Sequence, residues 1–563
     1  MWGPCPSGQW GRECTTLINP LDPSNPSDAR QVRSFLRRGF AGDAATDKTL
    51  WMVPGGPGIS SNGYGGAGDY FISLDPSITV YLLDLRGISY SNPVELDPGV
   101  PIACPFPPGS FFNPYDPTNV AIFQACNDWN VENFGDVMQF YTMYYAAVDF
   151  KIAIDAVNPG KIAIYAQSCG TFLVNSYLQL ANARADAVLL DGPVAPDRWS
   201  LEDNAQWAEK VSQDILLTCV QNSTVCRGHL GDRAHLARYT MDQIIDETLP
   251  CLSKLPWLQQ ADGHLLISFW SNILSSGEDN VKMLGPFWKR LQRCSDSDVV
   301  QLNFFRGLTL TPPPPQSTSD YSYFVATVSA VADLYSRAPA AKVLTYADQV
   351  IRSSRAMTDA GPEYTLSLAR ETYPVFPPSP FYMKYANPSM PVLVMVGTFD
   401  CNTPNGLGVY MSSGLGKNAQ LVNVPFASHG LLSAAAMPCT SNMILSFLLG
   451  FGSNAVDATC MSEIPFPDFD GSEDATKDTS FMYFGTRDLW NDGGQIDVEK
   501  APAGGDESGG DEWKNRNVFL LGLLIPTVVF GGVVTFFLLR WAPKPSISKQ
   551  FGDEPLMKYG DDH

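Results

Sequence analysis

One stretch of the chain decides the fold: Lys161-Ile-Ala-Ile-Tyr-Ala-Gln-Ser-Cys-Gly-Thr-Phe172. Residues 161–165 form a short, largely apolar run, which predicts a buried strand, and from residue 169 onward apolar or small residues recur at helical spacing. Between them lies a sharp turn around Ser168, with small residues two positions before it (Ala166) and two after it (Gly170). Such a turn leaves no room for bulk at those positions and lifts the serine hydroxyl above the edge of the sheet, as a nucleophile requires.

Two further residues complete the predicted catalytic triad. A serine nucleophile needs a base, and the base needs a carboxylate that fixes its tautomer. Of the five histidines, only His429 follows a late predicted strand, and Asp400 lies just past the strand at 391–396. Both stand at the carboxyl ends of strands, where open α/β sheets bind ligands. Ser168, Asp400 and His429 are therefore the predicted triad.

Backbone amides near the serine are predicted to bind the negatively charged oxygen of the tetrahedral intermediate. Cys169 follows Ser168 directly and supplies one N–H. Cys169 itself is a poorer nucleophile candidate, because Gln167 would then stand where bulk does not fit. The second donor is predicted at Gly56, within Gly55-Gly-Pro-Gly58, which follows an early strand. Donors of this kind typically contribute about 3–4 kcal/mol each.

The composition argues against nucleic acid as a partner. The 563 residues include 58 acidic and 37 basic side chains, a net charge of −21, whereas phosphate binding needs a basic surface. Between residues 463 and 513 there are 14 acidic and 3 basic residues (3 − 14 = −11), which is typical of a solvated linker. No cysteine pair shows zinc-ligand spacing with a histidine, and neither a metal nor another cofactor is expected.

Strands alternate with helices in two separate blocks, which predicts a parallel, doubly wound sheet. The predicted strands are 17–21 (an edge strand), 49–53, 78–83, 161–165, 187–190, 391–396 and 421–424. Helical stretches dominate between the blocks and predict an inserted cap. The expected organisation is a core of 1–196 and 387–462, a helical cap of 197–386, an acidic linker of 463–517, a transmembrane helix of 518–539 and a short polar tail of 540–563.

Residues 518–539 form an uncharged segment of 22 residues, long enough to cross a bilayer once. Many of the twelve cysteines fall in close pairs (5 and 14, 104 and 126, 219 and 226, 439 and 460) and are interpreted as disulfides. We therefore expect a lumenal or extracellular catalytic domain, with a glycosylation sequon at Asn222-Ser-Thr224. No signal peptide is visible, so the alternatives are an incomplete N-terminus, which the cysteines favour, or a tail anchor with a cytosolic enzyme domain.

Three motifs resemble the prolyl aminopeptidase and tripeptidyl aminopeptidase family of serine peptidases. They are Gly55-Gly-Pro-Gly-Ile-Ser60, Asp84-Leu-Arg-Gly-Ile-Ser-Tyr-Ser91 and the turn around Ser168. Asp191-Gly-Pro193 and the pattern from Gly397 to Pro404 are similar to the tripeptidyl branch. The resemblance covers about residues 10–465. It implies an α/β-hydrolase fold, with an inserted cap here, and release of residues from peptide N-termini.

This sequence departs from the family pattern without losing a triad residue. Ser89 and Ala166 each replace a glycine, and Pro54 stands where some members carry histidine. A serine carboxypeptidase is the nearest alternative, although Gln167 replaces the glutamate usual in that family's serine motif. An esterase or lipase is another, since the triad serves esters and amides alike. A non-catalytic adhesion domain is the third, and the complete triad argues against it.

An aminopeptidase must also bind a charged N-terminus close to Ser168, which requires a desolvated carboxylate. The cap is expected to provide it, because the loops of the sheet already carry the triad and the oxyanion hole. Glu202 and Asp203 are the candidates, although a solvated acid at the start of a helix is the commoner role for either residue alone.

Overall fold

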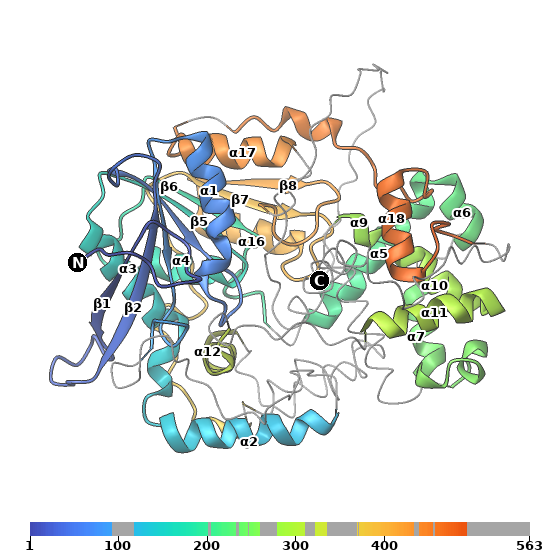
Figure 1. The fold of residues 1–563 in the computed structure, drawn as a ribbon, viewed down its shortest axis with the longest axis horizontal. Coiled ribbons are helices and arrows are strands. Elements are labelled where there is room, and N and C mark those ends of the chain that lie inside the picture. Colours follow the sequence, from blue (N-terminus) through green and yellow to red (C-terminus); the bar gives the residue numbers. More distant parts are fainter. Residues whose placement is uncertain are drawn as a thin grey trace, which may run out of the picture.

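The computed structural model describes residues 1–92, 117–200, 204–231, 236–245, 247–258, 278–309, 321–334, 369, 371–432, 438–453 and 456–491. Within these residues a single eight-stranded sheet runs in the order β1-β2-β4-β3-β5-β6-β7-β8 (Figure 1). The strands are β1 Glu13–Pro20, β2 Gln31–Gly39, β3 Lys48–Val53, β4 Thr79–Leu83, β5 Lys161–Gln167, β6 Ala187–Asp191, β7 Val392–Gly397 and β8 Ala419–Val424. The first two pairings, β1 with β2 and β2 with β4, are antiparallel, and all the others are parallel.

The central strands are buried on both faces, which explains their continuous apolar runs. One face packs on α3 (Met143–Val157), α4 (Cys169–Leu178), α12 (Tyr323–Ser329) and α16 (Asn405–Leu415). The other face packs on α1 (Gly65–Leu74) and α17 (Pro438–Leu449). At the two edges of the sheet, β1 and β8 alternate between buried and more exposed residues.

Strand β2 was not predicted, because its sequence is rich in arginine. The Arg37 side chain is fully buried and pairs with Asp84 at 2.6 Å, a partner 47 residues away in the sequence. A local hydrophobic pattern cannot reveal a charge that is paired in this way, since buried charges are tolerated only with a partner.

A second hydrophobic cluster lies to one side of the sheet, where helices gather (Figure 1). It contains residues of α5 (Asn204–Asn222), α6 (Thr224–Leu230), α7 (Leu236–Ile245), α9 (Glu278–Val281), α10 (Leu284–Arg293) and α11 (Asp296–Thr309). A long helix, α2 (Pro117–Phe134), lies outside this group. The helix α12 belongs to the predicted cap by position, yet Phe324 and Val325 pack into the cluster of the main sheet.

The segment expected to begin the acidic linker at residue 463 is folded as far as it is described. Residues 474–484 form helix α18 (Asp474–Phe484). Five apolar side chains of this segment are buried in the cluster of the cap helices: Phe469, Tyr483, Phe484, Leu489 and Trp490. Local charge counting missed this, because it does not register these five apolar side chains, which pack inward between acidic residues. Residues 492–517 lie outside the described part of the chain.

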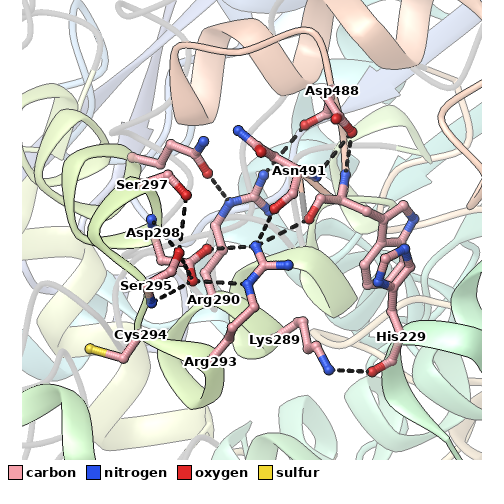
Figure 2. Close-up of polar contacts among 12 residues, drawn as sticks. His229, Lys289, Arg290, Arg293, Cys294, Ser295, Ser297, Asp298, Asp488 and Asn491 are labelled. Atoms are coloured by element: carbon pink, nitrogen blue, oxygen red, sulfur yellow. Dashed lines mark hydrogen bonds and ion pairs between the residues drawn. The ribbon is translucent and has the colours of Figure 1, made fainter. Parts of the chain in front are cut away.

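Figure 2 shows how polar contacts fasten this segment to α10. Arg290 donates to the Leu489 carbonyl at 3.0 Å. Arg293 pairs with Asp298 at 2.6 Å and also donates to the Trp490 carbonyl at 3.2 Å. The Trp490 ring stacks on His229 with the ring centroids 4.6 Å apart. We call residues 468–491 the C-terminal strap.

The structure confirms the prediction that closely spaced cysteines form disulfides. Three of the four close pairs are bonded as expected, and a fourth bond, which sequence proximity did not suggest, joins residues 43 positions apart. The bonds are Cys5–Cys14, Cys219–Cys226, Cys439–Cys460 and Cys251–Cys294. Cys126 is also disulfide-bonded, and its expected partner Cys104 lies outside the described residues. Within the described part of the chain, no helix is long and apolar enough to cross a membrane; residues 518–539 are not included in it.

Candidate active site

Ser168 occupies the sharp turn between β5 and α4. Its backbone has φ 53° and ψ −128°, a conformation that non-glycine residues rarely adopt and that costs strain energy. The turn lies directly against the end of β3, since a Cβ atom on Gly170 would stand 2.5 Å from the Pro54 carbonyl oxygen. This contact explains why a residue without a side chain is needed two positions after the serine.

The neighbouring thiol is poorly suited to act in place of the serine. Cys169 is only 3% exposed, and burial raises the pKa of its thiol to about 12. A cysteine nucleophile reacts as the thiolate, which is scarce at neutral pH when the pKa is so high. The backbone position of Cys169 is more informative. It is the first residue of α4, and the first amides of a helix have no partner within the helix and favour negative charge.

Asp400 and His429 come together in the loops that follow β7 and β8. The Nδ1 atom of His429 lies 2.8 Å from Oδ2 of Asp400, and both side chains are buried. The other carboxylate oxygen of Asp400 accepts the backbone N–H groups of Asn402 and Thr403 at 2.9 and 2.8 Å. These contacts hold the imidazole with its proton on Nδ1 and with Nε2 as the acceptor.

The Nε2 atom of His429 is buried and has no hydrogen-bond partner among the described residues. The hydrogen bond from Ser168 Oγ is therefore not formed in this structure. Such bonds are often long or poorly aligned in enzymes without substrate and tighten when substrate binds. An acceptor that is buried, oriented by a carboxylate and left unused is suited to take a proton from a nucleophile.

Opposing influences act on the pKa of His429. Burial lowers it most strongly, while the charge of Asp400, the hydrogen bond to that carboxylate and the charge of Asp191 raise it. The net result is a pKa above the ordinary value of 6.5. The imidazolium that forms when His429 accepts a proton is thus favoured at this site.

The turn after β6 joins the surroundings of Ser168 to those of His429. The Ser168 amide donates to the Asp191 carbonyl at 2.8 Å. The next residue, Gly192, has φ 61°, and a Cβ atom on it would stand 3.0 Å from Cε1 of His429. Because β6 pairs with both β5 and β7, this turn lies between the strands that carry Ser168 and Asp400.

The glycine-rich loop after β3 approaches the serine closely. A Cβ atom on Gly55 would stand 2.9 Å from Cβ of Ser168 and 3.4 Å from its Oγ. Gly56 has φ 125° and precedes a cis proline. Backbone rather than side chains therefore lines this side of the nucleophile, as the predicted oxyanion hole requires.

Two buried ion pairs explain the Asp84-Leu-Arg motif. Asp84 accepts the Ser60 hydroxyl at 2.8 Å and the Ser61 amide at 2.9 Å, so it holds the end of the glycine-rich loop. Arg86 pairs with Asp149 at 2.7 Å. Arg86 and Asp149 are 63 residues apart in the sequence, so no local pattern signals their pairing.

Part of the predicted cap reaches the glycine-rich loop. The Gly58 carbonyl accepts the Ser322 amide at 2.8 Å, and a Cβ atom on Gly58 would stand 2.9 Å from Cβ of Ala326 in α12. The predicted substrate residues Glu202 and Asp203 lie outside the described part of the chain. Within the described ranges no cluster of three or more potential metal ligands occurs.

Comparisons with known proteins agree with this architecture. Residues 48–215 match the family model described as alpha/beta hydrolase fold. The chain has the α/β-hydrolase fold. A second match, to a family of TAP-like proteins, covers residues 369–460 of the second hydrolase block. The expected hydrolase fold with a mostly parallel sheet is thus confirmed.

Solved structures similar to this hydrolase-fold chain include an esterase from Thermogutta terrifontis (14% identity, 78% of this chain and 100% of that chain, TM-score 0.32). Another is an esterase from Exiguobacterium antarcticum (11% identity, 74% of this chain and 96% of that chain, TM-score 0.33). A third is a proline iminopeptidase from Mycobacterium smegmatis (12% identity, 78% of this chain and 99% of that chain, TM-score 0.33). The sequence matches no curated protein.

Proposed function

We propose that this protein is a membrane-anchored serine peptidase that releases residues from the N-termini of peptides. One observation carries the catalytic part of the proposal. His429 is held by Asp400 through Nδ1, and its buried Nε2 has no partner among the described residues. Ser168 lies at the same edge of the sheet, in the strained strand-to-helix turn that is typical of a serine nucleophile.

The proposed reaction proceeds through an acyl-enzyme. Ser168 Oγ attacks the carbonyl carbon of the substrate while its proton passes to Nε2 of His429, and Asp400 stabilises the imidazolium. The N–H groups of Gly56 and Cys169 bind the developing oxyanion. His429 then donates the proton to the leaving amine. Water attacks the acyl-enzyme with His429 as base, which releases the acid product and restores the Ser168 hydroxyl.

The N-terminal direction of attack rests on the motif resemblance and is supported by the TAP-like match. A bound ammonium group would need a carboxylate from the cap, with Glu202 and Asp203 as the candidates. Gln167, which replaces the glutamate of the carboxypeptidase motif, is buried and accepts the Tyr64 hydroxyl. Its side-chain oxygen is therefore engaged inside the fold, which supports the aminopeptidase over the carboxypeptidase.

Blocked peptides test this direction. Free, N-acetylated and C-amidated versions of one peptide would be incubated with the protein and with its Ser168→Ala variant, and the products identified by mass. We expect cleavage of the free and C-amidated peptides only, and none by the variant. Cleavage of the N-acetylated peptide but not the C-amidated one would establish a carboxypeptidase instead. Turnover of esters but not of peptides would establish an esterase. No turnover of any peptide or ester would favour the non-catalytic adhesion domain.

The proposed location is a membrane, crossed once by residues 518–539, with the enzyme domain lumenal or extracellular. The disulfides support an oxidising compartment. The sequon residue Asn222 is exposed at the end of α5, so it is accessible to a glycan. A glycosidase that lowers the apparent mass of the wild-type protein, but not of an Asn222→Gln variant, would support this location. Absence of glycan together with reduced cysteines would favour the cytosolic tail anchor.

A further inference from the structure

Asp191, the last residue of β6, contacts both halves of the site. Its backbone carbonyl accepts the Ser168 amide at 2.8 Å. Its side chain is fully buried, and Oδ2 accepts the Tyr165 hydroxyl at 2.6 Å and the Leu432 amide at 3.3 Å. Leu432 lies three residues after His429. One residue therefore holds the amide of the nucleophile and the loop that carries the base.

Within the part of the chain that the structure describes, this carboxylate has no arginine partner of the kind that Asp84 and Asp149 have. Asp84 and Asp149 each pair with a buried arginine at 2.6 and 2.7 Å. Among the described residues Asp191 forms no ion pair with lysine or arginine, and its Oδ1 has no hydrogen-bond partner. A buried carboxylate without a cation is unfavourable for stability, and such groups concentrate at functional sites.

Of the titratable groups that interact with this carboxylate, His429 is the one that can carry a positive charge. Tyr165 faces it from β5, and Tyr64 interacts with it from the turn of residues 61–64. Both tyrosines are fully buried, and burial raises the pKa of each phenol, so both stay neutral. His429, which Asp400 holds through Nδ1, also interacts with Asp191 through its charge. Among the described residues, protonated His429 is the cation whose charge acts on Asp191.

We propose that Asp191 is a positioning residue for His429: its side chain anchors the histidine loop through the Leu432 amide, and its negative charge stabilises the imidazolium of the transition state. This inference rests on the proposed function. In the active form of the enzyme His429 is neutral, and its imidazolium forms as the proton leaves Ser168, so the interaction strengthens as the reaction proceeds. Such interactions raise kcat and leave substrate binding largely unchanged.

Two further observations agree with this role. The charge of Asp191 is among the causes that raise the pKa of His429. Burial raises the pKa of Asp191, while the Tyr165 hydroxyl, the backbone of the histidine loop and the charge of His429 oppose the rise. The net pKa of Asp191 is raised, and these donors with the charge of His429 offset only part of the effect of burial, in favour of the ionised form that can act on an imidazolium.

Asp191→Asn tests the inference, because it keeps an oxygen acceptor and removes the charge. With an activated ester as substrate, we expect kcat to fall about tenfold, the effect of losing one hydrogen-bonded charge, with KM nearly unchanged. The acid limb of the pH profile of kcat/KM should move to lower pH, since protonation of His429 becomes less favourable. Asp191→Glu, which restores the charge, should return the limb towards its original position.

Asp298→Asn is the matched control. Asp298 is also a buried carboxylate, but it pairs with Arg293 among the cap helices. Its loss should lower thermal stability and leave the acid limb in place. If Asp191→Asn proves unfolded, Asp191→Ser removes the same charge with a smaller side chain, and its pH profile is used instead.

The outcomes distinguish a failure of the role proposed for Asp191 from a failure of the proposed function. An acid limb that stays in place in the folded Asp191 variant, or that moves equally in Asp298→Asn, would overturn the role of Asp191 while leaving the triad intact. A wild-type protein that shows no Ser168-dependent turnover would refute the proposed function itself. The expected result is turnover that depends on Ser168, with an acid limb that moves only when residue 191 loses its charge.

Discussion

Gly192 lies so close to His429 that a Cβ atom on it would stand 3.0 Å from the imidazole Cε1 and 3.1 Å from Nδ1. A side chain here would press on the ring that Asp400 orients, and φ 61° is in any case unfavourable for residues other than glycine. We expect Gly192→Ala to lower kcat at least about tenfold, because catalytic groups act only when held close to their productive geometry. Steady-state kinetics measure the effect.

Gly66→Ala is the control for that substitution. Gly66 lies in α1, and nothing stands within 4 Å of a Cβ atom built on it. Alanine is the better helix former by about 0.5–1 kcal/mol, so the variant should be as active as wild type and slightly more stable. Full activity in Gly192→Ala would show that the contact with His429 does not matter for catalysis.

The raised pKa of His429 sets the sign of the pH dependence. Only the neutral imidazole can accept the Ser168 proton, so kcat/KM should fall as the pH drops through the His429 pKa. Because that pKa lies above its ordinary value of 6.5, the acid limb should lie above pH 6.5. A rate profile between about pH 5 and 9 measures it.

Asp400→Asn removes the charge and places the wrong tautomer on His429. We expect kcat to fall by up to ~10⁴ and the acid limb to move to lower pH. The Asp400 side chain also accepts two backbone N–H groups, so circular dichroism must show that the Asp400→Asn protein is folded. An Asp400→Asn protein with near-normal kcat would mean that another residue orients the base.

The C-terminal strap should be required for a stable protein. A chain ending at residue 465 loses five buried apolar side chains, Phe469, Tyr483, Phe484, Leu489 and Trp490, each contributing about 1.5–3 kcal/mol. That sum is comparable to the whole stability of a typical domain, about 5–15 kcal/mol. A chain ending at residue 491 keeps them. We expect the longer protein to fold and the shorter one to aggregate or unfold.

A single substitution tests the contact between the strap and the cap helices without shortening the chain. Arg290 is fully buried, and its removal would leave the Leu489 carbonyl and the Gln301 side chain without their donor. We expect Arg290→Ala to lower the free energy of unfolding by roughly 2–4 kcal/mol. Lys384→Ala, at an exposed position where the ammonium donates to the Pro380 carbonyl, should change it by less than about 0.5 kcal/mol. Equal effects would contradict the role assigned to the strap.

Deleting residues 513–563 should release the enzyme from membranes with its activity intact. The expected anchor at 518–539 would be lost, while the strap and the described fold end before the deletion. Fractionation of cells expressing the full chain and the truncated chain, followed by an ester assay on each fraction, measures this. Activity that remained in the membrane fraction after truncation would contradict a single C-terminal anchor.

The sequence predicted those parts of the fold whose signal is local. The apolar run at 161–165 corresponds to β5, which extends two residues further to Gln167, and the runs before residues 400 and 429 correspond to β7 and β8. Such strands are buried on both faces, or end at loops rich in turn residues, so composition alone reveals them.

The parts that escaped prediction depend on partners distant in the sequence. Arg37 makes β2 look exposed until Asp84 is placed beside it. The acidic strap resembles a linker until its aromatic residues meet the cap helices. In the site, residue order and strand ends suggested Asp400 and His429, whose side chains the structure brings to 2.8 Å. Asp191 stood out only as a point of resemblance, because its contacts with Ser168 and Leu432 exist only in three dimensions.

Covalent labelling of Ser168 tests the central claim most directly. The wild-type protein and the Ser168→Ala variant would be treated with a fluorophosphonate, and the labelled residue located by peptide mass spectrometry. The triad predicts stoichiometric modification of the wild type at Ser168 and none of the variant, with both proteins melting at similar temperatures. A wild-type protein that is folded but unlabelled, or a label on a residue other than Ser168, would contradict it.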